Sequence, residues 1–203
     1  MELPAGTTGM LVIELQNDLV HPSLAEGRGL TGALARAVRD RGVLPRLAGV
    51  LEDCRRRGVP VLYATKERAP GEPPPDHAPV YRMSGSEPIL VTGTWGSQVL
   101  DEVAPGPGDV VLPRLTSIDP SYGSELWPTV ERLGLTTLIM AGVSTTLAVE
   151  GTVRAAANRG LRVVVVEDCC ASVPEEWHRF SADHVLPLLA DVVSADDVRA
   201  ALR

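Results

Sequence analysis

Cysteine and lysine are both rare in this chain of 203 residues. The three cysteines are Cys54, Cys169 and Cys170, and an odd number with an adjacent pair makes neither a disulfide framework nor a spaced zinc motif. Lys66 is the only lysine beside 18 arginines, so a reaction that needs a lysine has a single candidate. We expect a protein of the reducing cytoplasm whose cysteines pack in the core.

Positive charge and long hydrophobic runs are lacking as well. The formal net charge is −7, and the longest basic run is the three arginines at 55–57, which argues against a nucleic-acid-binding protein. No segment approaches the roughly 18 uninterrupted apolar residues of a membrane-spanning helix, and residues 1–8 do not resemble an export signal. We therefore expect a cytoplasmic protein that binds neither nucleic acid nor membranes.

Motifs for cofactors and metals are also missing. Residues 14–18, which follow the first predicted strand, contain none of the glycines of a phosphate-binding loop. The four histidines are not spaced from a carboxylate as they are on a zinc-binding helix; they are His21, His77, His178 and His184. We expect no bound cofactor and no metal.

Short runs of β-branched residues recur along the chain, separated by helical patterns. The predicted strands cover residues 10–13, 59–63, 110–112, 136–140, 161–166 and, more weakly, 191–193. They are apolar throughout rather than alternating, which is typical of strands buried on both faces of a parallel sheet. The sequence therefore predicts a single α/β domain over residues 1–203, a three-layer α/β/α fold whose mostly parallel sheet of about six strands has helices on both faces.

Three helices are predicted between these strands. One carries an apolar stripe at three- and four-residue spacing: Leu44, Leu47, Val50, Leu51 and Cys54. The others cover residues 124–133 and 145–159, and each is followed by a glycine. The proline-rich residues 70–79 lie between elements without a change of composition, so we expect a surface loop rather than a domain linker.

The carboxyl ends of parallel strands meet at one edge of the sheet, where ligands bind in such folds. Glu14 directly follows the first strand, where partial burial favours a proton-donating role, although a solvated carboxylate is the simpler alternative. Arg114 follows the third strand and is suited to hold an anionic substrate, with a salt bridge at the rim as an equal alternative.

The fourth strand runs through Gly142 into a predicted helix entrance. Backbone N–H groups from Ser144 to Ala148 are expected to lack intrahelical partners there and to cradle an anion or oxyanion, with ordinary N-capping as the alternative. Trp95 stands in a glycine-rich turn, where it either walls a pocket or anchors the core.

Several segments recur here in the order of a known superfamily: Leu11-Val12-Ile13-Glu14-Leu15-Gln16-Asn17-Asp18, His21-Pro22, residues 59–63, Gly93-Thr94-Trp95-Gly96, residues 105–108, Gly123-Ser124-Glu125-Leu126, Ala141-Gly142-Val143-Ser144-Thr145 and Val166-Glu167-Asp168. As an ordered set, over nearly the whole chain, they resemble the isochorismatase-like hydrolases, also called cysteine hydrolases. The resemblance implies the same parallel-sheet fold, a small-molecule substrate and a homo-oligomer, either a dimer or a tetramer. It also implies a non-proline cis peptide near Val143–Ser144.

Amidases of this superfamily use an aspartate at the end of strand one, a lysine at the end of strand three and a cysteine at the start of the helix after strand four. The corresponding residues here are Glu14, Arg114 and Ala148, although another alignment of the loop puts a leucine in place of Arg114. An arginine cannot exchange protons, and an alanine cannot form a thioester. The chain is thus identified as a divergent member of the superfamily without the usual triad.

Two kinds of function follow from this pattern. The first is an enzyme without a cysteine nucleophile, in which Glu14 is the general acid or base and Arg114 holds a substrate carboxylate. It would act on a small carboxylated or cyclic metabolite by hydrolysis, with water as the nucleophile, or by cleavage of a vinyl ether. The predicted substrate contacts are Gln16, Trp95, Tyr122, Ser144, Thr145 and Ala148.

The second is a catalytically inactive binding or scaffold protein, which the change at all three triad positions also favours. We favour the enzyme, because Glu14 and Arg114 keep the charges of the family site.

Overall fold

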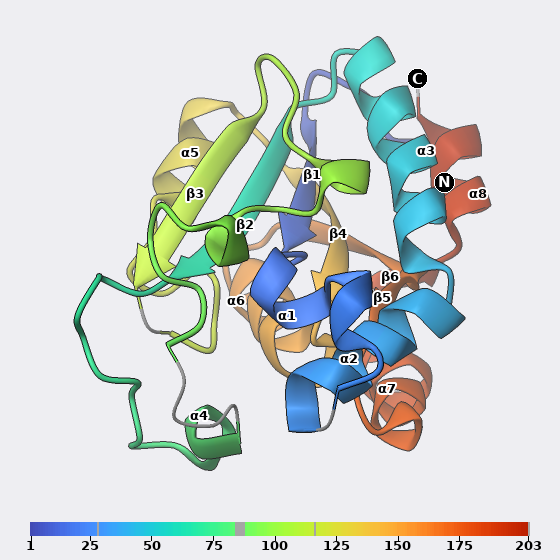
Figure 1. The fold of residues 1–203 in the computed structure, drawn as a ribbon. Coiled ribbons are helices and arrows are strands. Elements are labelled where there is room, and N and C mark those ends of the chain that lie inside the picture. Colours follow the sequence, from blue (N-terminus) through green and yellow to red (C-terminus); the bar gives the residue numbers. More distant parts are fainter. Residues whose placement is uncertain (28, 84–87, 116, 203) are drawn as a thin grey trace.

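In the computed structural model, a six-stranded parallel sheet lies between two layers of helices (Figure 1). The structure describes residues 1–203 except 28, 84–87, 116 and 203. The strands are β1 Thr8–Ile13, β2 Val61–Glu67, β3 Val110–Leu115, β4 Thr137–Val143, β5 Arg162–Ala171 and β6 Asp191–Val193. Their order is β3-β2-β1-β4-β5-β6, which confirms the predicted fold class.

Every predicted apolar run overlaps one of these strands, although three of the runs were expected to begin one or two residues earlier than the strand does. The central strands β1 and β4 are buried at each position, which accounts for their continuous apolar sequences. Four strands, β2 to β5, continue further toward their carboxyl ends than predicted, because pairing with a neighbouring strand continues there. In β2 the pairing reaches Lys66 and Glu67, which lie opposite Arg114 and Leu115 of β3.

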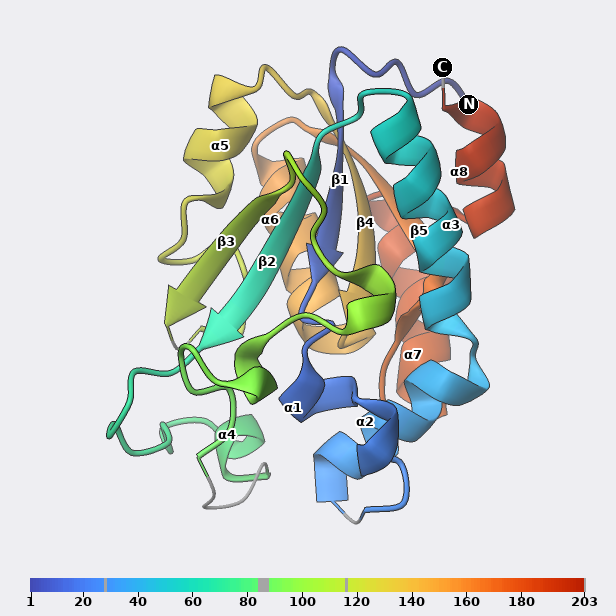
Figure 2. The ribbon, with the colours of Figure 1, turned by 45° about the horizontal axis from the view of Figure 1, so that its top comes forward.

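Helices cover both faces of the sheet (Figure 2). On one face, α3 Val43–Arg56 packs against α2 Gly29–Asp40 and α8 Ala195–Ala201. On the other lie α5 Leu126–Arg132 and α6 Glu150–Asn158. The remaining helices are α1 Asn17–Val20, α4 Pro79–Met83 and α7 Glu175–Phe180. The three predicted helices correspond to α3, α5 and α6, whereas α2 was not predicted.

The residues before α6 form a π-helical turn, η4 Thr145–Val149, so the predicted helix over 145–159 consists of two segments. The predicted loop at residues 70–79 is irregular and leads into α4. None of the helices among the residues that the structure describes is both long and apolar enough to cross a membrane.

The central strands approach one another closely at Gly142. This residue has φ of +129°, and a Cβ added to it would lie 2.1 Å from the backbone oxygen of Ile13. Only glycine allows this contact between the ends of β1 and β4. On the opposite side of the molecule, near the amino ends of the strands, Leu3 forms a β-bridge with Leu202. The two termini lie together there (Figure 1).

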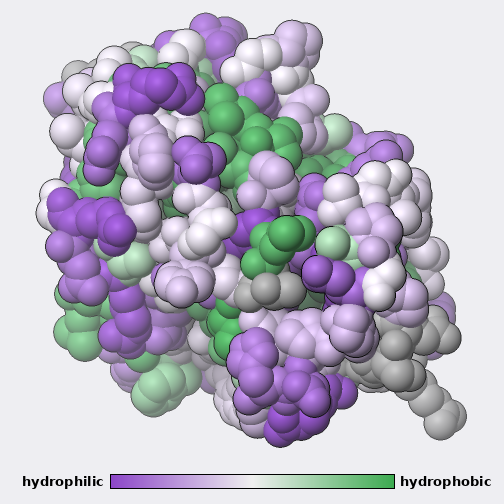
Figure 3. All heavy atoms as spheres, turned by 90° about the vertical axis from the view of Figure 1, so that its left-hand side faces the viewer, coloured by the Kyte–Doolittle hydropathy of each residue, from purple (hydrophilic) through white to green (hydrophobic). Residues whose placement is uncertain are grey.

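Strand β3 forms one edge of the sheet. Pro113 lies within it, as an edge strand tolerates, and Val111 and Leu115 are exposed. Figure 3 shows this side of the molecule, where small hydrophobic areas are separated by hydrophilic ones.

Candidate functional site

A pocket opens at the carboxyl edge of the sheet, between the ends of β1 and β4. The strand order reverses at this point, so the chain leaves the two strands in opposite directions and a crevice forms between them. The cavity measures about 90 Å³. Because a cavity of about 150 Å³ accommodates benzene, only the reacting end of a small metabolite fits inside. Its lining consists of Glu14, Leu19, Leu30, Leu34, Lys66, Val80, Tyr81, Ile118, Val143, Ser144, Leu147 and Ala148.

Glu14 enters this pocket from the end of β1. Its φ is +53°, in the left-handed region that a residue with a side chain rarely adopts. Backbone hydrogen bonds hold this conformation, since the Glu14 N–H donates to Ala64 at 3.0 Å and the Glu14 carbonyl accepts from Gln16 at 2.9 Å. Such a conformation is typical of functional sites, and here it turns a carboxylate into the crevice.

The carboxylate of Glu14 pairs with the guanidinium of Arg114. The Arg114 side chain is fully buried, and it also donates from Nε to the Ser117 hydroxyl at 2.9 Å and from Nη2 to the Ser117 carbonyl at 3.1 Å. Its Nη1 is buried without a hydrogen-bond partner among the described residues. The structure thus brings together the two groups that the sequence singled out.

Arg114 does not line the pocket beside Glu14, however. It contributes instead to a separate hollow of about 340 Å³ next to Glu67 and Thr92. A buried guanidinium needs a carboxylate to compensate its charge, and Glu14 meets that need. Arg114 thus pairs with Glu14 and is not among the residues that line the pocket, and its predicted role as a clamp on the substrate stays a prediction.

Lys66 lines the pocket, although no role had been predicted for it. Its ammonium lies 4.6 Å from the ring centroid of Tyr81 on α4, a cation–π contact. Burial lowers the pKa of Lys66 below its ordinary value; Glu14 acts to raise it and Arg114 to lower it. The signal was present in the sequence, because the rule that ligands bind at the carboxyl ends of strands applies to β2 as it does to β1 and β4.

Ser144, directly before η4, and Ala148, within it, both line the pocket. The Val143–Ser144 peptide is cis, as the resemblance implied. The predicted cradle of backbone N–H groups is smaller than expected, since the N–H groups of Leu147 and Val149 both donate to the Ser144 carbonyl at 3.1 Å.

Thr145 does not face the pocket, because its side chain is part of a buried network behind the turn. Its Oγ1 hydrogen-bonds with Nδ1 of His178 at 2.8 Å, and Nε2 of His178 lies 2.7 Å from a carboxylate oxygen of Glu167. The hydrogen bond from His178, opposed by burial and assisted by Arg41, lowers the pKa of Glu167 to about 2. This network fixes η4 to α7 and β5, so Thr145 positions the turn and is not in the pocket lining.

Three further predicted substrate contacts are not brought to the pocket. The buried amide of Gln16 is occupied by the Lys66 backbone, at 2.9 and 2.8 Å, and by the Ser97 carbonyl at 2.7 Å, so it ties β1 to β2. Trp95 is 54% exposed and lies edge-on to His21, which fits neither a pocket wall nor a core anchor. Tyr122 is 76% exposed on the surface.

The cysteines are buried, as predicted. Burial raises the pKa of Cys54 and of Cys170 to about 12. It also raises the pKa of Cys169 well above its ordinary value. A thiol in this state is a poor nucleophile. Within the described part of the chain, no group of three or more His, Cys, Asp or Glu side chains is arranged to hold a metal ion.

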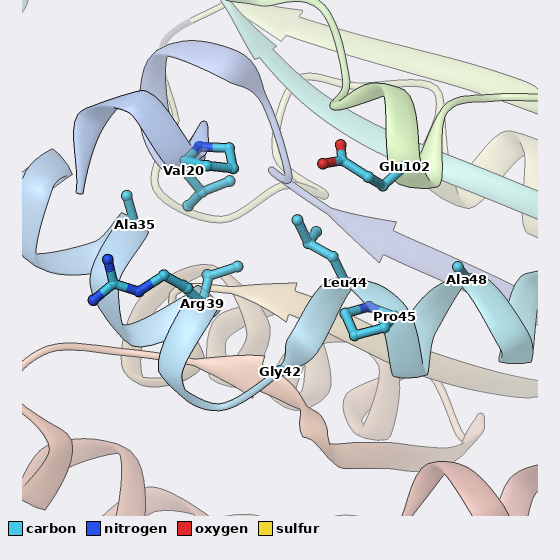
Figure 4. Close-up of a pocket in the computed structure, with 10 residues that line it drawn as sticks. Val20, Ala35, Arg39, Gly42, Leu44, Pro45, Ala48 and Glu102 are labelled. Carbon is cyan, nitrogen blue, oxygen red and sulfur yellow. The ribbon is translucent and has the colours of Figure 1, made fainter.

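A larger cavity, of about 540 Å³, lies away from the strand ends between α2, α3 and the turn that carries Glu102. Figure 4 shows its mainly apolar side chains, among them Leu44 and Pro45, with Arg39 and Glu102 on opposite sides. Because Arg39 and Glu102 do not converge on a common point, this cavity offers no acid–base pair, and the pocket at Glu14 is the better candidate site.

Comparisons with known proteins match the family and the fold. The isochorismatase domain family matches residues 8–197. A ureidoacrylate amidohydrolase from Methylobacterium radiotolerans is 28% identical over 197 residues, which cover 87% of this chain and 72% of that protein. An isochorismatase family protein from Desulfovibrio vulgaris superposes with a TM-score of 0.78 at 26% identity, over 96% of this chain and 98% of the other. For the N-carbamoylsarcosine amidase of Thermoplasma acidophilum the TM-score is 0.70 at 26% identity, over 94% and 97% of the two chains.

Proposed function

This chain belongs to the isochorismatase family, and from that premise we propose that it is an enzyme that acts on a small molecule without a cysteine nucleophile. Glu14 is the general acid or base, and the substrate is a small carboxylated or cyclic metabolite. The observation that carries the proposal is the position of the Glu14 carboxylate, in the crevice where the strand order reverses and beside Ala148.

The free oxygen of Glu14 supports this role. Arg114 pairs with Oε1, and no other hydrogen bond to the carboxylate is present in the described part of the chain. Oε2 is therefore available to move a proton, while Arg114 holds the carboxylate in place. The position that carries a thiol in the family amidases is occupied by Ala148, so a water molecule is the nucleophile in this proposal.

In hydrolysis of an amide or ureido group, Glu14 takes a proton from water, and the water oxygen adds to the substrate carbonyl carbon. The bond from carbon to nitrogen then breaks, and the proton passes from Glu14 to the leaving nitrogen. In cleavage of a vinyl ether, a protonated Glu14 gives its proton to a vinyl carbon, and water adds to the resulting oxocarbenium carbon and returns a proton to Glu14. The hemiketal then breaks its bond to the ether oxygen, its hydroxyl proton passes to that oxygen, and a carbonyl compound and an alcohol are released. The relatives that are named for amide and ureido substrates support the first reaction.

A substrate panel tests the proposal. Ureido acids, carbamoyl amino acids, amides and a vinyl ether are incubated with the purified chain, and the products are measured by mass spectrometry. For the substrate that is turned over, Glu14→Gln lowers kcat by about 10²- to 10⁴-fold, as loss of a general acid or base does. Glu102→Gln, at the other cavity, is the matched control and retains turnover.

Two outcomes contradict the proposal. Unchanged turnover by Glu14→Gln removes Glu14 from the reaction, and a covalent adduct on the protein during turnover removes water as the nucleophile. If no member of the panel is turned over or bound, the inactive scaffold protein is the better description.

The assembly and location of the protein belong to the same proposal. The exposed apolar side chains of Trp177, Phe180 and Leu188 support a homo-oligomer, either a dimer or a tetramer. Light scattering after size-exclusion chromatography measures this, and a monomer at all concentrations contradicts it. The three free thiols support a cytoplasmic location.

A further inference from the structure

Lys66 occupies an unusual position in the pocket. It lies on β2 directly opposite Arg114 of β3, so two cations end neighbouring strands and approach the same carboxylate, that of Glu14. Gln16 hydrogen-bonds with both the N–H and the carbonyl of Lys66, at 2.8 and 2.9 Å, which holds this strand end in place. Only the lysine lines the pocket with Glu14; the arginine does not.

The ammonium of Lys66 is short of partners. It contacts the Tyr81 ring, but in the described part of the chain its Nζ makes no hydrogen bond and no ion pair. An ammonium has three N–H donors, and a cation–π contact satisfies none of them. A group of opposite charge that carries hydrogen-bond acceptors suits this position in the pocket.

The charges around the pocket do not balance. Glu14 supplies one negative charge, and its ion pair with Arg114 already uses it. Lys66 adds a positive charge, and the buried Nη1 of Arg114 is a further donor with no partner among the described residues. A single anionic group on a ligand would bring the three side chains close to neutrality.

We propose that Lys66 binds an anionic group of the substrate, a carboxylate, in the pocket beside Glu14. The inference rests on the proposed function, because it takes this pocket as the substrate site, and it assigns to Lys66 the contact that the sequence suggested for Arg114. Tyr81 holds the ammonium from α4, and Lys66 thereby restricts the substrates to small carboxylates. Desolvation already lowers the pKa of the unpaired ammonium, and pairing with a carboxylate reverses that shift.

The composition of the chain makes a direct test possible. Lys66 is the only lysine, so labelling lysine with ¹³C at the ε position gives one lysine signal in the NMR spectrum. Propionate and its neutral analogue propionamide are the probes. We expect propionate to shift this signal and to raise the pKa of Lys66, and propionamide to do neither. A signal and a pKa that respond to neither probe overturn the inference.

Variants distinguish the effect of the Lys66 charge on propionate binding from an effect on folding. Lys66→Met weakens propionate binding by about tenfold or more, the worth of a charge-assisted hydrogen bond, whereas Lys66→Arg retains most of it. Arg82→Met, which removes an equal charge from the exposed surface of α4, is the control and binds propionate normally. Equal propionate binding by Lys66→Met and the unchanged chain overturns the inference. These are binding measurements, so failure of the proposed function is seen separately, as unchanged turnover by Glu14→Gln.

Discussion

At position 148 a methyl group faces the pocket, and each thiol of the chain lies elsewhere in the core. The location of a thiol matters because it reacts only when it can ionise to the thiolate and when the substrate can reach it. Cys54 and Cys170 meet neither condition, since burial raises the pKa of each to about 12. The chemistry proposed for the pocket therefore uses Glu14 and Lys66 rather than sulfur.

This placement predicts how the thiols respond to alkylation. We expect iodoacetamide at pH 8 to leave the folded chain unmodified and to label all three cysteines after denaturation, as measured by intact-mass spectrometry. Ala148→Cys adds a thiol to the pocket lining and is expected to take up one label in the folded state. Labelling of the unchanged folded chain contradicts the burial of its cysteines.

Glu167 predicts a pH dependence of stability. Its pKa in the folded chain is about 2, mainly because of the hydrogen bond from His178, whereas an unfolded glutamate titrates near 4.3. The unfolded chain takes up the proton first, so the stabilisation is present above about pH 4.3 and is lost as the pH falls toward 2. Urea unfolding at several pH values measures it. Glu167→Gln should flatten the dependence in this window, and an unchanged pH profile in that variant contradicts the assignment.

At the scale of elements, the site depends on how closely β1 and β4 approach. Gly142 permits the contact with Ile13, and the chain passes from β4 through Ser144 into η4, so that Ser144 and Ala148 line the pocket. Behind this turn, the hydrogen bonds from Thr145 to His178 and from His178 to Glu167 connect it to α7 and β5. The pocket geometry is thus set by strand contact on one side and by a polar network on the other.

Two glycine substitutions test this arrangement. Gly142→Ala places a Cβ 2.1 Å from the Ile13 oxygen, so β1 and β4 must separate and the melting temperature should fall steeply. Gly160 has φ of +76°, but a Cβ added to it has no atom within 4 Å. Gly160→Ala should therefore lower the free energy of unfolding only by the cost of the left-handed conformation, about 1–2 kcal/mol. Thermal unfolding compares the two. Equal losses of stability in the two variants would contradict the idea that the close contact at Gly142 stabilises the fold.

At the scale of the whole molecule, one sheet and one continuous hydrophobic cluster join the first strand to the last helix. The bridge between Leu3 and Leu202 connects the two ends of the chain on the side away from the pocket. Because side chains from every strand of the sheet belong to this cluster or pack against it, the chain is expected to unfold as a single unit.

The three tryptophans make this prediction measurable. Trp95, Trp127 and Trp177 lie before β3, on α5 and on α7, so their combined fluorescence samples distant parts of the fold. We expect the urea transition seen by fluorescence to coincide with the one seen by far-UV circular dichroism. Two separate transitions would contradict the single-domain organisation predicted for residues 1–203.

Sequence alone determined the strands of the sheet and the position of Glu14 at its carboxyl edge. Apolar runs identify strands that are buried on both faces, and a charged residue directly after such a run, like Glu14, must lie at the carboxyl edge whatever the loops do. The contacts between distant segments were decided by the tertiary structure. Tyr81 contacts Lys66 from beyond the proline-rich loop, the Gln16 amide hydrogen-bonds with Lys66 and Ser97, and Arg114 pairs with Glu14. Periodicity reports which face of an element is buried, but the partner that a polar side chain finds depends on how separate elements pack.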